Sequence, residues 1–100
     1  MHVECNFFGP FRDTVGTKTV ERECPRGTTL LELIYDLEEE YEGIADQLLA
    51  DEETLKENIS IAVDGEHVRQ LDGEKTELDD GSVVRFAPPV SGGGQPSPNR

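Results

Sequence analysis

Apolar and polar residues alternate near the start of the chain. In the segment "HVECNFF" the apolar residues Val3, Cys5 and Phe7 are separated by polar neighbours, which is the period-two pattern of a strand with one buried face. The segment "TKTVEREC", residues 17–24, resumes a β-rich pattern, and turn-forming residues occupy positions 9–16 between the two. We therefore expect a β-hairpin with a long loop.

The pattern then changes to helical spacing. Thr29 and Glu32 form a capping-box pair, and Gly43 is suitably placed to cap a helix end. Apolar residues between these signals recur at intervals of three and four, at Leu30, Leu33, Ile34, Leu37 and Tyr41. This spacing predicts an amphipathic helix over residues 29–42. Further apolar residues predict an irregular or short helical segment at Ile44, Leu48 and Leu49.

Alternation returns in the second half of the chain. Apolar residues occupy every second position of residues 59–63, and the pair Asp64-Gly65 that follows is a strong signal for a two-residue hairpin turn. A strand should therefore turn into a short second one. Residues 82–87 predict a last strand in which Val84 and Phe86 share one face.

The order of these elements predicts the fold class. Strand, strand, helix, strand, short strand and strand make an α+β protein, in which one main helix covers one face of a mixed sheet. This order is typical of a ubiquitin-like β-grasp with four to five strands. We expect a β-grasp domain over residues 1–90, followed at 91–100 by a flexible, glycine-rich tail.

Composition adds a strong charge bias to this picture. The chain has 100 residues, with 22 acidic and 9 basic ones, and a formal net charge of −13. Nucleic acid is therefore a poor partner, because phosphate contacts require clustered Lys and Arg. Self-repulsion should destabilise the compact state in dilute buffer, whereas molar salt shortens the Debye length to roughly 3 Å. This charge favours a halophile's cytoplasm, although other acidic proteins share it.

Side-chain catalysis is not indicated by the sequence. There is no nucleophile elbow and no phosphate-binding loop, since "GGG" lacks the Lys-Ser/Thr that follows one. His2 and His67 lack nearby spaced ligands, and Cys5 and Cys24 are too few for a metal site, so we expect buried cysteines and no metal or cofactor. We expect a non-enzyme that is cytoplasmic, because neither an export signal nor a membrane-spanning run is present.

Two motifs at opposite ends of the chain carry a family resemblance. "FFGPFRDTVG", residues 7–16, resembles the first hairpin loop of the ubiquitin-like sulfur carriers, and "PPVSGG", residues 88–93, resembles their C-terminal signature. This family includes the small subunit of molybdopterin synthase and the small archaeal modifiers. Its members normally end at the second glycine, which corresponds to Gly93, whereas seven residues follow Gly93 here. The resemblance thus implies a precursor cut after Gly93, or after Gly94 if the register shifts.

The resemblance also implies the chemistry of this terminus. An E1-like enzyme would use ATP to adenylate the exposed carboxylate, after a processing protease has removed the extension. The activated glycine would then form an isopeptide bond with a target lysine or become a thiocarboxylate, and the sequence leaves both open. Glycine at 92 and 93 allows entry into a narrow channel, and residues 87–93 span up to roughly 24 Å when extended. The activation site is therefore Gly92, Gly93 and Gly94.

Partner contacts are expected around the root of the tail. The candidate contact residues are Arg12, Phe8, Phe86, Pro88, Pro89 and Val90. The two prolines should end strand pairing and stiffen the tail. The period-two pattern favours a core position for Phe86 and a surface position for Phe8, and Arg12 is equally compatible with a solvated loop charge. The lysines Lys18, Lys56 and Lys75 are either acceptors of modification or ordinary surface residues.

Three functions are compatible with these residues. The first is a ubiquitin-like modifier or sulfur carrier. The second is the small subunit of a molybdopterin synthase, acting in the pocket of a larger subunit. The third is a β-grasp binding module in which the glycines form an ordinary flexible end. In this case the residues after Gly94 are a disordered tail or a remnant of cloning. For the first function we expect a monomer when the protein is free, because a carrier must dock to several partners in turn.

Overall fold

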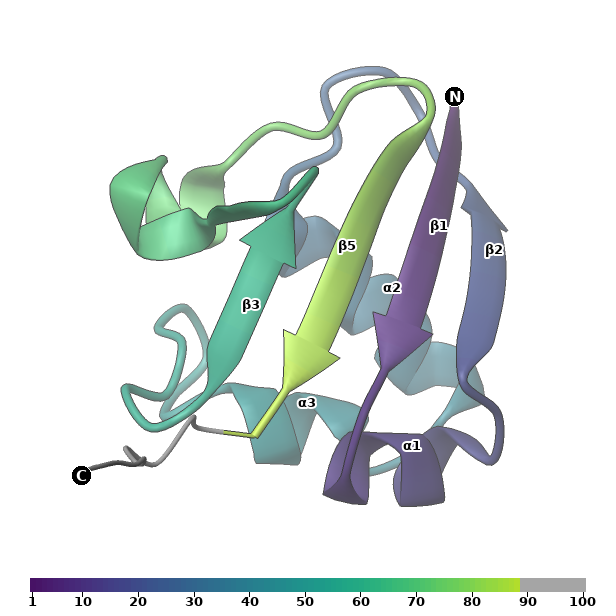
Figure 1. Cartoon of the computed structure of the whole chain (residues 1–100), viewed down its shortest axis with the longest axis vertical. Helices are drawn as coiled ribbons and strands as arrows, with labels where there is room; N and C mark the ends of the chain where they lie inside the picture. Colours follow the sequence, from purple (N-terminus) through teal and green to yellow (C-terminus); the bar gives the residue numbers. More distant parts are fainter. Residues whose placement is uncertain (89–100) are drawn as a thin grey trace, which may run out of the picture.

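A mixed five-stranded sheet carries the helices of the protein on one face and at one end (Figure 1). The computed structural model describes residues 1–88. The strands are β1 (His2–Phe7), β2 (Thr19–Glu23), β3 (Ser60–Val63), β4 (Glu66–His67) and β5 (Ser82–Ala87). The helices are α1 (Pro10–Val15), α2 (Leu30–Glu40) and α3 (Ile44–Leu48), with the 3-10 turns η1 (Val68–Gln70) and η2 (Gly73–Lys75). The predicted ubiquitin-like β-grasp class and its single main helix are confirmed.

The strand order places β5 at the centre of the sheet, β2-β1-β5-β3-β4. β1 and β5 are parallel, so both strands end at the same edge, while the other neighbouring pairs are antiparallel. The register sets Phe7 opposite Phe86. Their rings stack with centroids 5.1 Å apart and planes 8° from parallel. The predicted sharing of one face by Val84 and Phe86 is confirmed, since both side chains are fully buried.

Helix α2 covers the buried face of the sheet. Its apolar stripe of Leu30, Leu33, Ile34 and Leu37 packs against the inward side chains of β1, β3 and β5. The predicted capping box is present, because the Glu32 N–H donates to Thr29 Oγ1 at 3.3 Å and the Thr29 N–H donates to Glu32 Oε1 at 2.9 Å. These bonds satisfy backbone donors that the first helical turn leaves without intrahelical partners.

The end of α2 differs from the prediction. The helix stops at Glu40, and Tyr41 is its C-cap. Gly43 was expected to cap α2, but it is instead the N-cap of α3, with φ 101°. The Glu38 side chain explains this arrangement, because its carboxylate accepts hydrogen bonds from the N–H groups of Gly43 at 3.1 Å and Ala45 at 2.8 Å. A carboxylate at these free N–H groups stabilises a second, separate helix start.

The loop predicted between β1 and β2 contains a helix. Pro10 is at the first helical position of α1, and Gly16 ends it in the left-handed region with its N–H bonded to Arg12 O at 2.7 Å. Proline at the start and glycine just past the end are a known helix signature, so the signal was present in the sequence. Burial of Phe11 and Val15 anchors this helix at the edge where β1 ends.

The predicted β3–β4 turn and the predicted burial of the two cysteines are confirmed. The hairpin turn between β3 and β4 has Asp64 at φ 53° and Gly65 at φ 85°, as a two-residue turn of this type requires. Cys5 and Cys24 are buried free thiols. Burial raises the pKa of the Cys5 thiol to about 12, so this thiol stays protonated and unreactive at neutral pH. No helix within residues 1–88 is long and apolar enough to span a bilayer.

Candidate functional site

The root of the tail, which is the segment Ala87–Pro88 at the end of β5, lies at the edge of the sheet where β1 and β5 both end (Figure 1). The last sheet-like bond at this edge is donated by the Phe8 N–H to Phe86 O, at 3.0 Å. β5 ends at Ala87, and Pro88 follows without an N–H to donate, as predicted. The expected contacts Pro89 and Val90, like the three glycines 92–94, lie outside the described residues.

The two motifs from opposite ends of the chain touch at this edge. A Cβ atom at Gly9 would lie 3.0 Å from Cγ and 3.1 Å from Cδ of Pro88. Gly9 also has φ 62° and ψ −137°, a conformation that is essentially restricted to glycine. The backbone conformation therefore favours glycine at this position, and a larger residue would also press against the proline ring. The contact holds the root of the tail against the start of α1.

A shallow groove continues from this contact. Pro10 and Gln47 border it on the side of the helices, and Lys56 and Ile59 border it on the side of the loop before β3, with Pro88 beside them. Gln47 is fixed in this position because its side-chain oxygen accepts a hydrogen bond from Thr14 Oγ1 at 2.7 Å. The groove thus begins at Pro88, the last residue that the structure describes.

The candidate partner contacts occupy different environments. Phe8 is half-buried beside the root of the tail, and Lys18 Nζ lies 5.5 Å from its ring centroid. Arg12 is exposed on α1 and makes no ion pair within residues 1–88. Phe86 is fully buried against Phe7. Its assignment as a surface contact is therefore wrong, and its role is in the core, as the period-two pattern favoured.

Three basic residues belong to segments near the end of β5. Arg12 is on α1, Lys56 borders the groove, and the carbonyl of Lys18 accepts the Phe7 N–H at 2.7 Å at the end of β1. These are three of the nine basic residues of a chain whose net charge is −13. Cations near an acidic protein's functional end favour association with a partner surface of opposite charge. Of the three lysines that could accept a modification, Lys18 is exposed and Lys56 is half-buried. The third, Lys75, is exposed on η2.

The face of the sheet opposite α2 was not singled out by the sequence analysis. The side chains that alternate with the core positions point to this face, among them Glu4, Ala62 and Arg85. Glu4 and Ala62 are half-buried, and Arg85 is exposed. Neither α2 nor α3 covers this face in the described part of the chain (Figure 1). The alternation that identified the core positions also identifies the residues of this surface. The surface extends to the edge where β1 and β5 end.

The described residues hold no set of metal ligands. No group of three or more His, Cys, Asp or Glu side chains is arranged for a metal ion within residues 1–88. His2 lies on the surface of the sheet between two carboxylates, with Nε2 3.0 Å from Glu21 and Nδ1 2.9 Å from Glu23. The hydrogen bond to Glu23 raises the pKa of His2. These contacts link β1 to β2.

The fold and this site define a class of protein, a ubiquitin-like β-grasp domain whose central strand leads into a glycine-rich C-terminal segment. The sequence model of the ThiS family matches residues 5–93, and the chain belongs to this family. Small archaeal modifier protein 3 from Haloferax volcanii is 39% identical over 93 residues, which cover 93% of this chain and all of that relative.

Two solved structures extend the comparison. The Amycolatopsis orientalis BexX/CysO complex contains a chain 33% identical to this one, with a TM-score of 0.77 over 91% of this chain and 99% of that one. A Pyrococcus furiosus protein described as a putative molybdopterin converting factor, subunit 1, is 30% identical, with a TM-score of 0.70 over 90% and 99% of the two chains. The chain is thus one of the ubiquitin-like sulfur carriers and modifiers.

Proposed function

We propose that this protein is a ubiquitin-like modifier and sulfur carrier that acts through the carboxylate of Gly93. The contact between Gly9 and Pro88 carries this proposal, because it ties the start of the tail to the first-hairpin motif. A central strand that pairs on both sides gives the tail a rigid base. The family match, which ends at Gly93, supports the choice of that glycine as the terminus.

The proposed chemistry requires no catalytic side chain from the carrier. A processing protease hydrolyses the peptide bond after Gly93 and leaves a carboxylate. An E1-like enzyme lets this carboxylate attack the α-phosphorus of ATP, which forms an acyl adenylate and releases pyrophosphate. A lysine amine of a target then attacks the carbonyl carbon, loses a proton and displaces AMP to form an isopeptide bond. Displacement of AMP by a sulfur donor instead leads to the thiocarboxylate.

The carrier contributes geometry to this reaction. The five residues from Pro89 to Gly93 span up to roughly 18 Å when extended, so a terminus that starts from a fixed Pro88 can enter a deep site. Fixing Pro88 lowers the entropic cost of ordering the tail when the protein docks to a partner. Phe8, Arg12 and the face opposite α2 surround this base, and we assign them to the contact with the activating enzyme. Pro89 and Val90 would continue this contact along the tail.

The decisive experiment compares C-terminal variants in the native host. Tagged chains of residues 1–93, 1–94 and 1–100 are expressed, together with a 1–93 chain in which Gly93→Val blocks the terminus and a 1–100 chain with Gly93→Val and Gly94→Val. Intact-mass spectrometry and immunoblots then measure thiocarboxylates and protein conjugates. We expect both products from the 1–93 and 1–100 chains and neither from the valine variants. Equal yields from the valine variants would show that the glycines are dispensable.

A second candidate function is the small subunit of a molybdopterin synthase. The similarity to the Pyrococcus furiosus molybdopterin converting factor favours it. In this function the thiocarboxylate would donate sulfur inside a larger subunit. Co-purification of such a subunit with the 1–93 chain and loss of molybdoenzyme activity on deletion are the expected results. Normal molybdoenzyme activity in the deletion strain would exclude this function without affecting the first.

The net charge of the chain indicates the kind of cell in which the protein works. We propose that the protein works as a monomer in the cytoplasm of a halophilic archaeon, consistent with the net charge of −13 and with a relative from Haloferax volcanii. An inert-tail binding module is the remaining alternative. Deletion of residues 92–100 would leave its phenotype intact, whereas a carrier would lose all function.

A further inference from the structure

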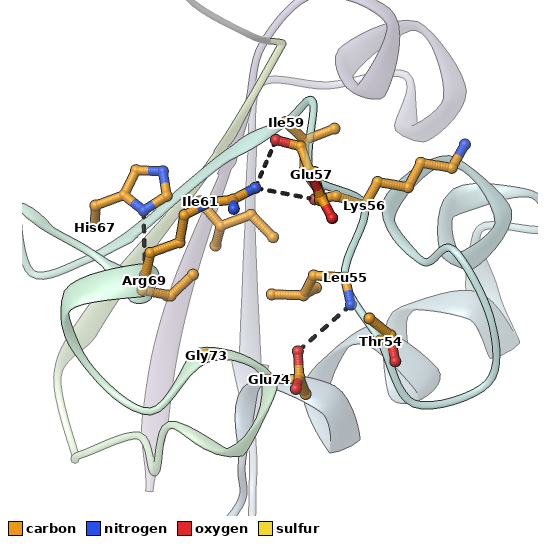
Figure 2. A pocket seen from close by; sticks show the side chains of 11 residues that line it. Thr54, Leu55, Lys56, Glu57, Ile59, Ile61, His67, Arg69, Gly73 and Glu74 are labelled. Carbon is orange, nitrogen blue, oxygen red and sulfur yellow. Dashed lines mark hydrogen bonds between the residues drawn. The ribbon is translucent and has the colours of Figure 1, made fainter.

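A cavity of about 210 Å³ opens beside the groove at the root of the tail. Its wall is apolar, formed by Leu55, Ile59 and Ile61, with Val68 of η1 closing the far side. Ile61 and Val68 are buried, whereas Leu55 and Ile59 are half-buried and face the opening. Figure 2 shows the side chains of Leu55, Ile59 and Ile61 around the same opening as Arg69 and Glu74. An apolar side chain of moderate size is the kind of group that such a cavity holds.

Two cationic side chains, Arg69 and Lys56, line this cavity together with the carboxylates of Glu57 and Glu74. Arg69 spans its mouth, where Nη2 donates hydrogen bonds to the backbone carbonyls of Glu57 at 2.5 Å and Lys56 at 3.5 Å (Figure 2). Both bonds use the same nitrogen, so Nε and Nη1 keep donors for a further acceptor. Within residues 1–88 neither Arg69 nor Lys56 forms an ion pair with a carboxylate. The fork of donors on Arg69 matches the geometry of a carboxylate.

The cavity is continuous with the groove that begins at Pro88. Lys56 and Ile59 belong to the walls of both. Pro88 borders the groove on one side of this shared wall, and the cavity lies on the other side. Val90 is two residues after Pro88, and it is the one branched aliphatic residue between Pro89 and Gly93. Gly93 is five residues after Pro88, within roughly 18 Å of it along an extended chain.

We propose that this cavity is a resting site for the chain's own mature C-terminus, in which Val90 occupies the apolar wall and the Gly93 carboxylate binds Arg69 and Lys56. The proposal rests on the maturation at Gly93 proposed above. The mature tail carries an apolar side chain and a terminal anion, and the cavity offers an apolar wall and two cationic side chains. The other occupant of the site, a partner's peptide, is an outcome of the test below.

The contact need not be strong to be populated. A tether of a few residues gives its two ends an effective concentration in the millimolar range when it can span them, so an intrinsic dissociation constant near 1 mM already fills the site about half of the time. Glycine at 92 keeps the linker between the two contacts flexible. The activating enzyme would displace the tail from this site when it docks. The resting site would thus shield the free carboxylate between rounds without blocking activation.

The purified chain of residues 1–93 tests the proposal by NMR. We expect methyl signals of Ile61 and Val68 to differ between chains 1–93 and 1–88, and the Gly93 carboxyl to titrate at a lower pH in chain 1–93 than in its Arg69→Gln variant. Val90→Ser should remove the methyl shifts. Arg26→Gln, which removes a cation away from this cavity, is the matched control and should change neither measurement.

A second comparison leaves every side chain unchanged. A 1–93 chain ending in a carboxamide lacks only the terminal charge, and its methyl shifts should fall by severalfold. Identical spectra for the 1–88, carboxylate and carboxamide chains would overturn the proposal, and shifts produced only by an added peptide would assign the cavity to a partner. Because no activating enzyme is present, these results are independent of conjugate or thiocarboxylate formation in the host, which tests the proposed function separately.

Discussion

Gly9 lies directly against the ring of Pro88, where an added Cβ would be 3.0 Å from Cγ of the proline. The two residues are far apart in the sequence, and the parallel pairing of β1 with β5 brings them together. This relationship joins the first loop of the molecule to the start of its tail. It makes the position of the tail depend on a glycine that is distant from it in the sequence.

Replacement of this glycine tests the relationship. Gly9→Ala should destabilise the fold by about 1–3 kcal/mol, because the backbone conformation there is restricted to glycine, and it should also lower conjugate or thiocarboxylate yield. Gly16→Ala is the control, since Gly16 has φ 88° but no atom within 4 Å of an added Cβ. Denaturant melts and mass spectrometry measure the two effects. If both variants gave equal yields, the contact with Pro88 would have no role in activity.

The two phenylalanines near the tail should separate stability from partner binding. Phe86→Ala should cost about 3–5 kcal/mol, because it removes a fully buried ring, and Phe86→Leu should cost less. Phe8→Ala should cost less stability than Phe86→Ala, since Phe8 is only half-buried, but it should weaken activation. Chemical denaturation together with an ATP–pyrophosphate exchange assay distinguishes these outcomes. Unchanged exchange with Phe8→Ala would remove Phe8 from the partner contact.

The Glu38 carboxylate should make stability depend on acid pH. Its hydrogen bonds from Ala45 and Gly43 lower the pKa of Glu38 in the folded state. A lowered folded pKa means that the carboxylate stabilises the protein above its unfolded pKa of about 4.5, and this contribution is lost progressively as pH falls from there through the lower folded pKa. Melts between neutral and acid pH should show a smaller decrease for Glu38→Gln than for the unchanged chain. Glu39→Gln, which changes an exposed neighbour, should behave like the unchanged chain.

Salt should stabilise the protein. A net charge of −13 on 100 residues produces repulsion that molar salt screens. The melting temperature should therefore rise steadily from dilute buffer to molar potassium chloride. Chloride is the suitable anion, because sulfate strengthens apolar burial in any protein. A melting temperature that is equal or higher in dilute buffer would contradict the halophilic interpretation.

Much of the fold was predictable because its signals are local. The spacing of Leu30 to Leu37 and the Thr29–Glu32 capping box predict α2, and Asp64-Gly65 predicts the β3–β4 turn, since each depends on neighbours within a few residues. The same kind of signal marked α1 through Pro10 and Gly16, but turn-forming residues in that stretch favoured a loop. Gly43 was assigned to the wrong helix, because a left-handed glycine between two helices has the same local sequence in either role.

The sequence by itself therefore determined the elements, the buried faces and the family resemblance of the tail, all of which depend on periodicity or on contiguous residues. Only the tertiary structure decided which distant residues meet. Parallel pairing of β1 with β5 placed Gly9 under Pro88 and stacked Phe86 on Phe7, and the packing of η1 beside β3 brought Arg69 to the loop of Lys56. Such contacts arise from the register of the sheet and the closing of loops, which local patterns do not encode.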